Sequence, residues 1–280
     1  MSSILTNNSA MVALQTLKSI NSNLSDTQNS ISTGKDINTA KDNASVWAIS
    51  KVMESDVAGF DAVQDSLSVG QSTVAVASTG AERIVETLTE MKELAVSAQS
   101  ETADFGKIEA DMASKRDQID AIISGSQFNG VNLLKTDIDG TGGTSLTVVS
   151  SLDRVGSGAP TVSTIDVSSA DFETSVDTSA MTAIADVTTA ASAFGEIETM
   201  LTAAINGAAA LGSDGKRVDD QMDYISKLSD TVTSGIGALV DTDMEAASAK
   251  LQALQTQQQL GVQALSIANE SPSTIMSLFR

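Results

Sequence analysis

Residues 46–98 read VWAISKVMESDVAGFDAVQDSLSVGQSTVAVASTGAERIVETLTEMKELAVSA, the longest regular stretch in the sequence. Apolar or small residues recur along it in fifteen steps over 52 residues, about 3.5 residues per step, which is the seam spacing of a left-handed coiled coil. These positions are Val46, Ile49, Met53, Val57, Phe60, Val63, Leu67, Gly70, Val74, Ala77, Ala81, Ile84, Leu88, Met91, Ala95 and Ala98. No proline interrupts them, so the sequence predicts one helix about 80 Å long.

Helical spacing returns twice further along the chain. A shorter stripe has Lys115 on its line, where the long side chain can reach out of the seam, and it consists of Ile108, Met112, Ile119 and Ile122. A longer stripe consists of Phe194, Ile197, Leu201, Ile205, Ala208, Leu211, Val218, Met222, Ile225, Leu228, Val232, Ile236 and Leu239. Within it, Gly212 and Gly215 either bend the helix or are tolerated in it.

The segment between these helices has a different amino-acid composition. Seventeen of the 45 residues from Thr136 to Ala180 are Ser or Thr, and ten acidic residues face one basic residue, Arg154, between Asp137 and Glu198. Alternation in residues 146–148 and 162–167 predicts two short strands. The composition suggests an exposed insert, and we expect it to tolerate deletion of residues 141–160.

The two chain ends differ from both of these regions because they are nearly neutral in charge. Residues 1–40 carry two basic and two acidic side chains, and residues 241–280 carry two basic and four acidic ones. Apolar stripes with alternating steps of three and four residues run through both ends. The first stripe consists of Ala10, Ala13, Leu17, Ile20 and Leu24. The second consists of Met244, Ala247, Leu251 and Leu254, and it is followed by the apolar residues Leu260, Val262, Leu265 and Ile267. Because a lone helix of this kind is marginal in water, we expect the two ends to pair.

These patterns predict a mainly α fold in which long, coiled-coil-like helices from both chain ends pair and a small β-rich insert lies in the middle. The chain then divides into a terminal-helix domain (1–40 with 241–280), a second helical domain (41–136 with 181–240) and a short β-rich surface insert (137–180). An ordinary helical bundle with a loop is the simpler alternative that periodicity leaves open.

Composition narrows the function. The 280 residues carry a formal charge of −20, which repels phosphate backbones and gives anionic lipid no basic face. No apolar run approaches the roughly 20 residues of a membrane span. The first eight residues lack the charged start and apolar stretch of a cleavable secretory signal. We therefore expect no nucleic-acid or membrane partner, and any export must use another route.

Residue types that carry common chemistry are missing. The sequence has no His and no Cys, which removes thiol nucleophiles, Ser-His-Asp triads and His-containing zinc sites. Aromatic residues make up only 3% of the chain, too few to line an ordinary substrate pocket. Neighbouring carboxylates at Asp219-Asp220 and Asp241-Thr242-Asp243 are typical of solvated helix faces and helix starts. The sequence thus predicts neither an enzyme nor a cofactor or metal site.

Several segments resemble bacterial flagellins. Residues 24–53, LSDTQNSISTGKDINTAKDNASVWAISKVM, resemble the family's N-terminal signature, and residues 126–134, SQFNGVNLL, resemble the segment after its second helix. Residues 239–280 resemble its C-terminus, including Asp241-Thr242-Asp243-Met244 and Ala268-Asn269-Glu270-Ser271-Pro272. Trp47 and the small insert depart from the family pattern, and the small insert implies a short form without large outer domains.

The resemblance implies a structural subunit that polymerises into the flagellar filament for swimming motility. In that family the paired terminal helices form an inner tube, a helical shell surrounds it, and the insert faces outward. The resemblance also implies export through the flagellar type III apparatus with an export chaperone, an extracellular location without a cleaved signal peptide, and contact with hook-associated and cap proteins. A head-to-tail interface that does not close generates such a helical homopolymer.

Two sets of residues follow as candidate sites. Self-assembly is expected to depend on the apolar stripes of the terminal helices, here Leu17, Ile20, Leu24, Leu251, Leu254 and Leu265. The resemblance further implies a receptor-contact segment, because the stretch matching residues 90–96 is the main contact of many flagellins with the flagellin-sensing toll-like receptor. That stretch starts with Arg in the family and with Glu90 here, whereas Lys92 and Leu94 match the family's basic and apolar contacts. A plain solvated Glu90 with no partner is the alternative.

Two other functions compete with a filament subunit. A hook–filament junction protein shares the terminal organisation, but Gln127-Phe128-Asn129-Gly130 and the C-terminal Ala-Asn-Xaa2-Pro favour flagellin. A chemoreceptor-like signalling coiled coil, from a different class, would have one uninterrupted hairpin and a membrane anchor. A flagellin carrying a zinc protease motif is excluded because the chain has no His.

Overall fold

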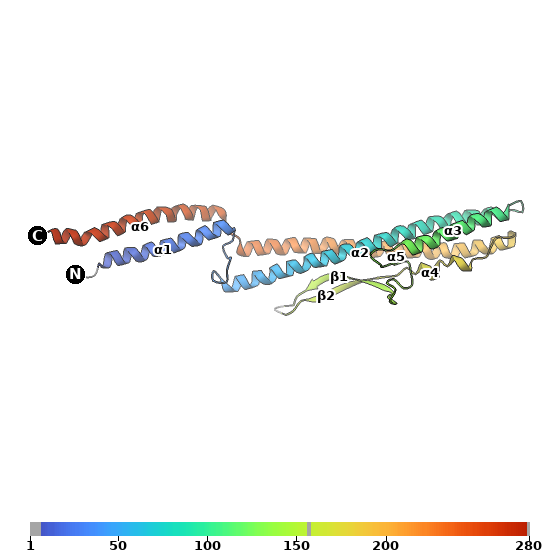
Figure 1. The fold of residues 1–280 in the computed structure, drawn as a ribbon, viewed down its shortest axis with the longest axis horizontal. Coiled ribbons are helices and arrows are strands. Elements are labelled where there is room, and N and C mark those ends of the chain that lie inside the picture. The colour runs from blue at the N-terminus through green and yellow to red at the C-terminus, as the bar shows by residue number, and fades with distance from the viewer. Residues whose placement is uncertain (1–6, 156–157, 279–280) are drawn as a thin grey trace. The chain divides into compact units, whose positions relative to one another are not determined.

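The computed structural model describes residues 7–155 and 158–278, with side chains described as far as residue 270 (Figure 1). Its elements are α1 (Asn8–Thr33), α2 (Ala44–Ser97), α3 (Phe105–Gly125), β1 (Ser145–Asp153), β2 (Thr161–Ser168), α4 (Phe172–Ser175), a 3-10 turn (Thr178–Ala180), α5 (Val187–Val240) and α6 (Met244–Leu278). The strands form one two-stranded antiparallel sheet. The predicted fold class, mainly α with a small β-rich insert, is confirmed.

The chain forms two compact units. One combines the residues up to Ser55 with those from Thr231 onward, and the other consists of Asp56–Asp230. In the first unit, α1 and α6 run side by side (Figure 1). The Asn7 side chain caps α1 by accepting a hydrogen bond from the Ala10 N–H, and Gly34, with a φ of 71°, ends it in the left-handed conformation that glycine adopts without strain.

The second unit is built around the predicted seam of α2. Every stripe position from Phe60 to Ala98 is buried, namely Phe60, Val63, Leu67, Gly70, Val74, Ala77, Ala81, Ile84, Leu88, Met91, Ala95 and Ala98. Ile49, on the part of α2 that belongs to the first unit, is instead 51% exposed. The coiled-coil spacing thus identifies the core of the second unit but overstates burial at the start of the helix.

The other two predicted stripes have the correct helical period, but some of the residues that the structure buries differ from the predicted ones. Helix α3 buries Met112, Ile119 and Ile123, whereas Ile122 is half-buried. Helix α5 exposes Ile205 and Leu239, both of which the pattern predicts to be buried, and buries the adjacent residues Ala204 and Val240. The buried face of α5 therefore combines small residues with large ones such as Ile197 and Leu211, displaced by one position from the predicted stripe at these two sites. Gly212 and Gly215 are tolerated, because α5 is continuous from Val187 to Val240.

The hairpin of β1 and β2 packs onto α2 through positions that lack a side chain. A Cβ atom at Gly70 would lie 2.6 Å from Val148 Cγ2, and one at Gly59 would lie 2.5 Å from Leu152 Cδ2. These glycines therefore form notches for alternate residues of β1, whose side chains point to one face of the strand. The Phe172 ring occupies the corresponding space at Gly207 of α5. Val148 is only 2% exposed in this packing.

Polar contacts with α2 and α5 also hold the same hairpin. Arg154 Nε and Nη2 donate to both carboxylate oxygens of Asp56 on α2, at 2.6–3.0 Å. From α5, Gln221 donates to the Ser150 carbonyl oxygen and Arg217 to the Asp166 carbonyl oxygen. Residues 141–160 contain all of β1, so their deletion would uncover the α2 seam. The structure gives no support to the expectation that this deletion is tolerated.

Candidate assembly surface

The six predicted self-assembly residues lie on the two helices that pair. Leu254 is 7% exposed, and Leu17, Ile20, Leu24, Leu251 and Leu265 are half-buried. The pairing is close at Gly261, where a Cβ atom would lie 3.1 Å from Leu17 Cδ1 and 3.8 Å from Ile20 Cδ1. These side chains thus join α1 to α6 within one subunit.

Hydrogen bonds show that the two helices run in opposite directions. Asn7 Nδ2 donates to the Ala268 carbonyl oxygen at 2.7 Å, and Gln258 Nε2 donates to Asn21 Oδ1 at 2.7 Å. The start of α1 therefore lies beside the part of α6 near Ala268. Neutral amides supply both bonds, so the pairing uses no ion pair at these points.

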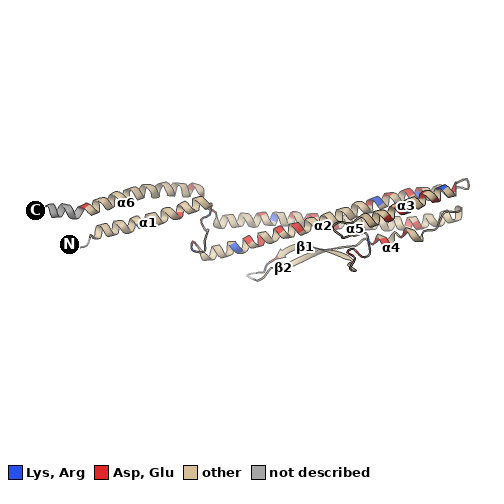
Figure 2. Ribbon diagram, in the orientation of Figure 1, with Lys and Arg blue, Asp and Glu red and all other residues tan. Residues whose placement is uncertain are grey.

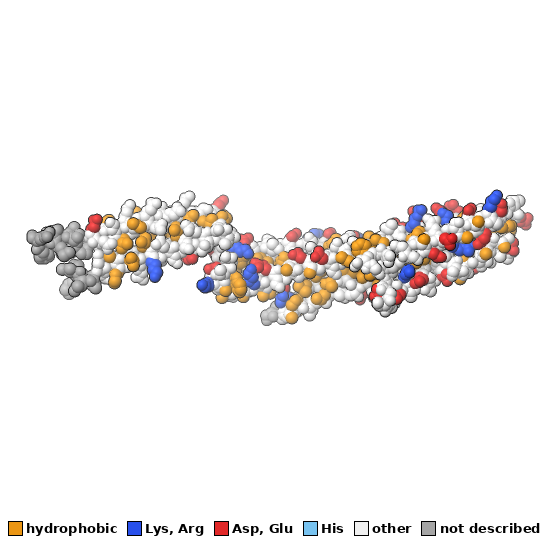
Figure 3. Space-filling view, in the orientation of Figure 1, with side chains coloured by type: hydrophobic (Ala, Val, Ile, Leu, Met, Phe, Trp, Pro, Cys, Tyr) orange, Lys and Arg blue, Asp and Glu red, His pale blue; other side chains and the backbone are white. Residues whose placement is uncertain are grey.

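A second apolar surface covers the outside of the same helices and has no partner among the described residues. We call it the apolar collar, and it consists of Met11, Val12 and Leu14 on α1 and Leu260, Val262 and Ile267 on α6. Their side chains are 54–70% exposed. Hydrophobic side chains are visible over this part of α1 and α6 in Figure 3. Exposed apolar side chains that gather on one part of a surface are typical of interaction sites, so the collar is a surface that another chain can cover.

Sequence reasoning located this surface only in part. Leu260, Val262 and Ile267 follow the apolar stripe in the sequence of the last helix, and in the structure they are exposed. Met11, Val12 and Leu14 were not predicted at all. The usable signal is their position, because apolar residues that fall outside a three-and-four stripe must point away from the helix that the stripe contacts.

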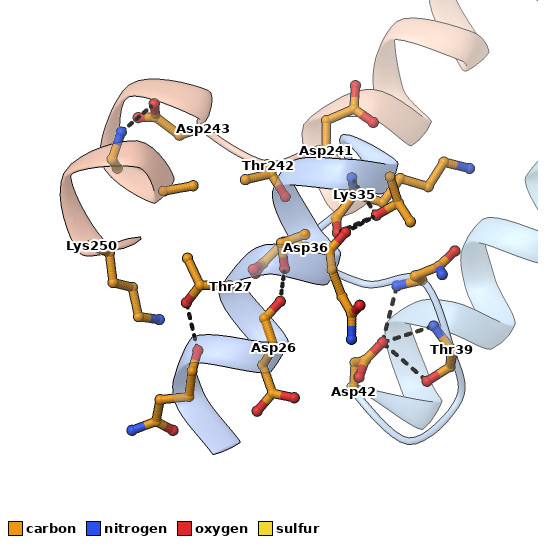
Figure 4. Close-up of a pocket in the computed structure, with 17 residues that line it drawn as sticks. Asp26, Thr27, Lys35, Asp36, Thr39, Asp42, Asp241, Thr242, Asp243 and Lys250 are labelled. Carbon is orange, nitrogen blue, oxygen red and sulfur yellow. Dashed lines mark hydrogen bonds between the residues drawn. The ribbon is translucent and has the colours of Figure 1, made fainter. Parts of the chain in front are cut away.

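A polar groove of about 850 Å³ lies where α1 ends and α6 begins (Figure 4). The two chain connections that line it are bonded together, because the Asp36 N–H donates to the Val240 carbonyl oxygen and the Thr242 N–H to that of Gly34. Asp42 accepts from the Asn38 and Thr39 N–H groups, and the Thr39 N–H is the main cause that lowers the pKa of Asp42. These hydrogen bonds therefore fix the geometry of both connections that line the groove.

Three of the four carboxylates that lie close together in the sequence have structural partners. Asp219 accepts a hydrogen bond from Gln71, and Asp220 forms an ion pair with Lys216 one helical turn earlier. Asp243 caps the start of α6 by accepting from the Glu245 and Ala246 N–H groups. Among the residues that the structure describes, no group of three acidic side chains could hold a metal ion.

The charges of the predicted receptor-contact segment are used inside the subunit. Glu90 accepts a hydrogen bond from Lys115 of α3, which is the main cause that lowers the Glu90 pKa. Lys92 Nζ lies 2.7 Å from Glu198 Oε2 and 5.8 Å from the centre of the Phe194 ring, both on α5. Leu94 is half-buried. Glu90 is thus exposed to solvent, with Lys115 as its partner within the subunit.

Long helices with a coiled-coil seam, chain ends that pair and an apolar surface without a partner together define a class of protein, the helical subunit that assembles with copies of itself. Two family models identify the members. The model of the bacterial flagellin N-terminal helical region matches residues 4–138, and that of the bacterial flagellin C-terminal helical region matches residues 194–279. These matches cover more than half of the chain, so the chain belongs to the bacterial flagellin family.

Full-length relatives agree with this assignment. Flagellin FljK of Caulobacter vibrioides is 43% identical over 286 residues, covering 100% of this chain and 99% of the relative. A flagellin of Brucella melitensis is 43% identical over 287 residues, covering 100% of both chains. The chain is therefore a structural subunit of the bacterial flagellar filament, which lies outside the cell.

A solved structure shares the fold at low identity. It is a Vibrio parahaemolyticus protein described as flagellar hook-associated, with a TM-score of 0.53, 14% identity, and coverage of 71% of this chain and 100% of that chain. At this identity the likeness concerns the fold alone, and the matches over the full chain favour a filament subunit over a junction protein or a chemoreceptor coiled coil. Within the described residues, no helix combines the length and hydropathy that crossing a membrane requires.

Proposed function

We propose that the paired chain ends, residues 1–40 with 241–280, form the inner tube of the filament. Residues 41–136 with 181–240 form the shell around it, and residues 137–180 face outward. The observation that carries this proposal is the apolar collar, because α1 and α6 already bury one stripe against each other and leave a second apolar surface uncovered. Neighbouring copies cover that surface in the filament.

The distribution of charge supports the same arrangement. Figure 2 shows few charged residues on α1 and α6, whereas acidic residues are frequent along α2, α3 and α5. Helices with little charge pack closely in many copies without mutual repulsion, and an acidic surface is best placed in water. The charge pattern therefore favours terminal helices inside and the Asp56–Asp230 unit outside.

The protein reaches this position through the flagellar type III export apparatus, assisted by an export chaperone and without cleavage of a signal peptide. Cap and hook-associated proteins contact it at the ends of the filament. The role is structural, with no catalytic activity. The resemblance of the chain ends to flagellins supports these steps.

Seeded polymerisation tests the proposed role of the chain ends. The purified full chain is mixed with short filament seeds, and growth is followed by light scattering and electron microscopy. We expect long filaments whose density map places α1 and α6 nearest the axis. Filaments with these helices on the outer surface would contradict the proposal.

The receptor-contact segment gives a separate prediction. We expect weak activation of the flagellin-sensing receptor by the native monomer, since a site that accepts a guanidinium faces the Glu90 carboxylate. Replacing a charged hydrogen bond with a clash costs about 1.5–3 kcal/mol or more, and about 1.4 kcal/mol corresponds to tenfold in affinity. Glu90→Arg is therefore expected to raise activation by about tenfold or more in a reporter-cell assay.

The control uses the partner of Glu90. Glu90→Arg leaves Lys115 facing a second cation, so the double variant Glu90→Arg/Lys115→Glu restores the ion pair with reversed polarity. Both variants are expected to activate the receptor more strongly than the native protein. Native potency equal to that of a strongly stimulatory flagellin, or no gain in either variant, would contradict the prediction.

A further inference from the structure

Met11 is the most exposed methionine among the described side chains. It is 62% exposed, and Met244 follows at 47%. In contrast, Met91 and Met112 are fully buried and Met181 is 6% exposed. Thioether sulfur is oxidised according to its exposure, so an oxidant in solution reaches Met11 and Met244 long before it reaches the core methionines.

The surroundings of Met11 distinguish it from Met244. Met11 is part of the apolar collar together with Val12 and Leu14, and the Asn7–Ala268 hydrogen bond places it beside the stretch of α6 that contains Ile267. These collar side chains offer a covering chain no hydrogen-bond donor. Met244 lies at the first position of α6, next to the polar groove and to the exposed Glu245. Met11 thus lies among apolar side chains, with Asn8 and Gln15 exposed one turn away along α1, whereas Met244 adjoins the groove and a carboxylate.

We propose that Met11 is an oxidation site that controls the addition of a subunit to the filament. The inference depends on the proposed function, because it requires the collar to be covered by a second copy. A peroxide transfers one oxygen atom to the Met11 sulfur, which loses two electrons and becomes a sulfoxide, and hydrogen peroxide is thereby reduced to water. The free subunit is open to this reaction, and the assembled one is closed to it.

The sulfoxide blocks addition because it converts an apolar side chain into a polar one. A polar S=O group buried without a hydrogen-bond partner has a desolvation cost that the thioether does not have. The collar side chains themselves carry only alkyl groups and the Met11 thioether. We expect the concentration of free subunit needed for growth to rise by at least about tenfold, which corresponds to about 1.4 kcal/mol.

The test compares four full-length proteins with and without hydrogen peroxide. Native protein, Met11→Leu, Met244→Leu and Met11→Gln are treated as monomers, freed of peroxide and added to untreated native seeds. We expect treated native protein and treated Met244→Leu to lose growth, and treated Met11→Leu to retain it. Met11→Gln, which carries a polar group of similar length, is expected to grow poorly without any oxidant. Peptide mass spectrometry is expected to show Met11 oxidised at least about fivefold faster in monomers than in filaments.

The outcomes separate this inference from the proposed function. If untreated native protein grows and treated native protein grows equally well with Met11 oxidised, the Met11 inference is wrong and the inner-tube proposal stands. Equal sensitivity of treated Met11→Leu and native protein overturns the inference as well, since another methionine is then responsible. Filaments in which the collar lies open to solvent would overturn both.

Discussion

Leu254→Asp is expected to prevent the subunit from joining filament seeds. Leu254 is 7% exposed on α6, where α6 faces α1, so the substitution places a carboxylate in an apolar contact, and Lys250, one turn earlier on the helix, is exposed to solvent. An uncompensated buried charge costs about 3–5 kcal/mol. At about 1.4 kcal/mol per factor of ten, the concentration needed for growth rises about a hundredfold or more. Seeded growth followed by light scattering and electron microscopy measures this effect.

The matched control is Gln255→Asp, which introduces the same charge on the next residue of the helix, where the side chain is exposed. It is expected to leave growth within a few-fold of the native rate. Circular dichroism of the Leu254→Asp monomer is expected to show the Asp56–Asp230 unit still helical. Normal filaments from Leu254→Asp would show that the α1–α6 pair does not carry assembly.

Gly70→Ala is expected to destabilise the Asp56–Asp230 unit. The added Cβ would lie 2.6 Å from Val148 Cγ2 and 2.9 Å from Val148 Cγ1, so the strand must move or the helix must bend. Overpacking of this kind costs about 1–3 kcal/mol, against a gain of about 0.5–1 kcal/mol from replacing glycine within a helix. The net loss is expected to lower the Tm by several degrees, at about 2–4 °C per kcal/mol for a unit of this size. Thermal unfolding followed by circular dichroism measures this shift.

Gly195→Ala supplies the control because Gly195 lies on α5 with nothing within 4 Å of the added Cβ. It is expected to raise stability by about 0.5–1 kcal/mol, so the two substitutions have opposite signs. Exchange of the backbone amides of β1 with deuterium is expected to accelerate in Gly70→Ala only. If Gly70→Ala stabilises as much as Gly195→Ala does, the notch does not hold the hairpin.

Periodicity predicted the core of the second unit because one geometric rule governs it. A residue that recurs every 3.5 positions returns to the same side of a supercoiled helix, and the stripe from Phe60 to Ala98 is buried without exception. The rule fails at Ile49, on the part of α2 in the first unit, and at Ile205, where the smaller Ala204 occupies the interface. Periodicity predicts which residues share one side of a helix, whereas their burial also depends on which element packs against that side.

The contacts between the β1–β2 hairpin and the helices could not be predicted from the sequence. Gly70 fitted the seam as a small residue, but its role as a notch depends on Val148, 78 positions away in the chain. Similarly, Ser/Thr-rich composition describes the exposed face of the insert and is silent on its buried face, where Val148 and Val167 are only 2% and 0% exposed. Contacts between segments so far apart leave no local pattern.

In the candidate assembly surface, too, local patterns could be predicted from the sequence and contacts between distant segments could not. The inward residues Leu17 and Leu254 could be predicted because each belongs to a local stripe, and the antiparallel pairing then follows from two helices with complementary apolar faces. The outward direction of Leu260 could not, since it depends on which side of α6 faces α1. Likewise, the partner of Glu90 is Lys115, which reaches it from another helix.

Hydrogen–deuterium exchange of the terminal helices, compared between free subunits and filaments, tests the central claim most directly. We expect backbone amides of residues 8–33 and 244–270 to exchange markedly more slowly in the filament, because neighbouring copies cover both helices and suppress their local opening. Slower exchange at the collar residues Met11 and Ile267 is the specific expectation. Equal exchange of these helices in the two states would contradict the claim that the paired chain ends carry the assembly.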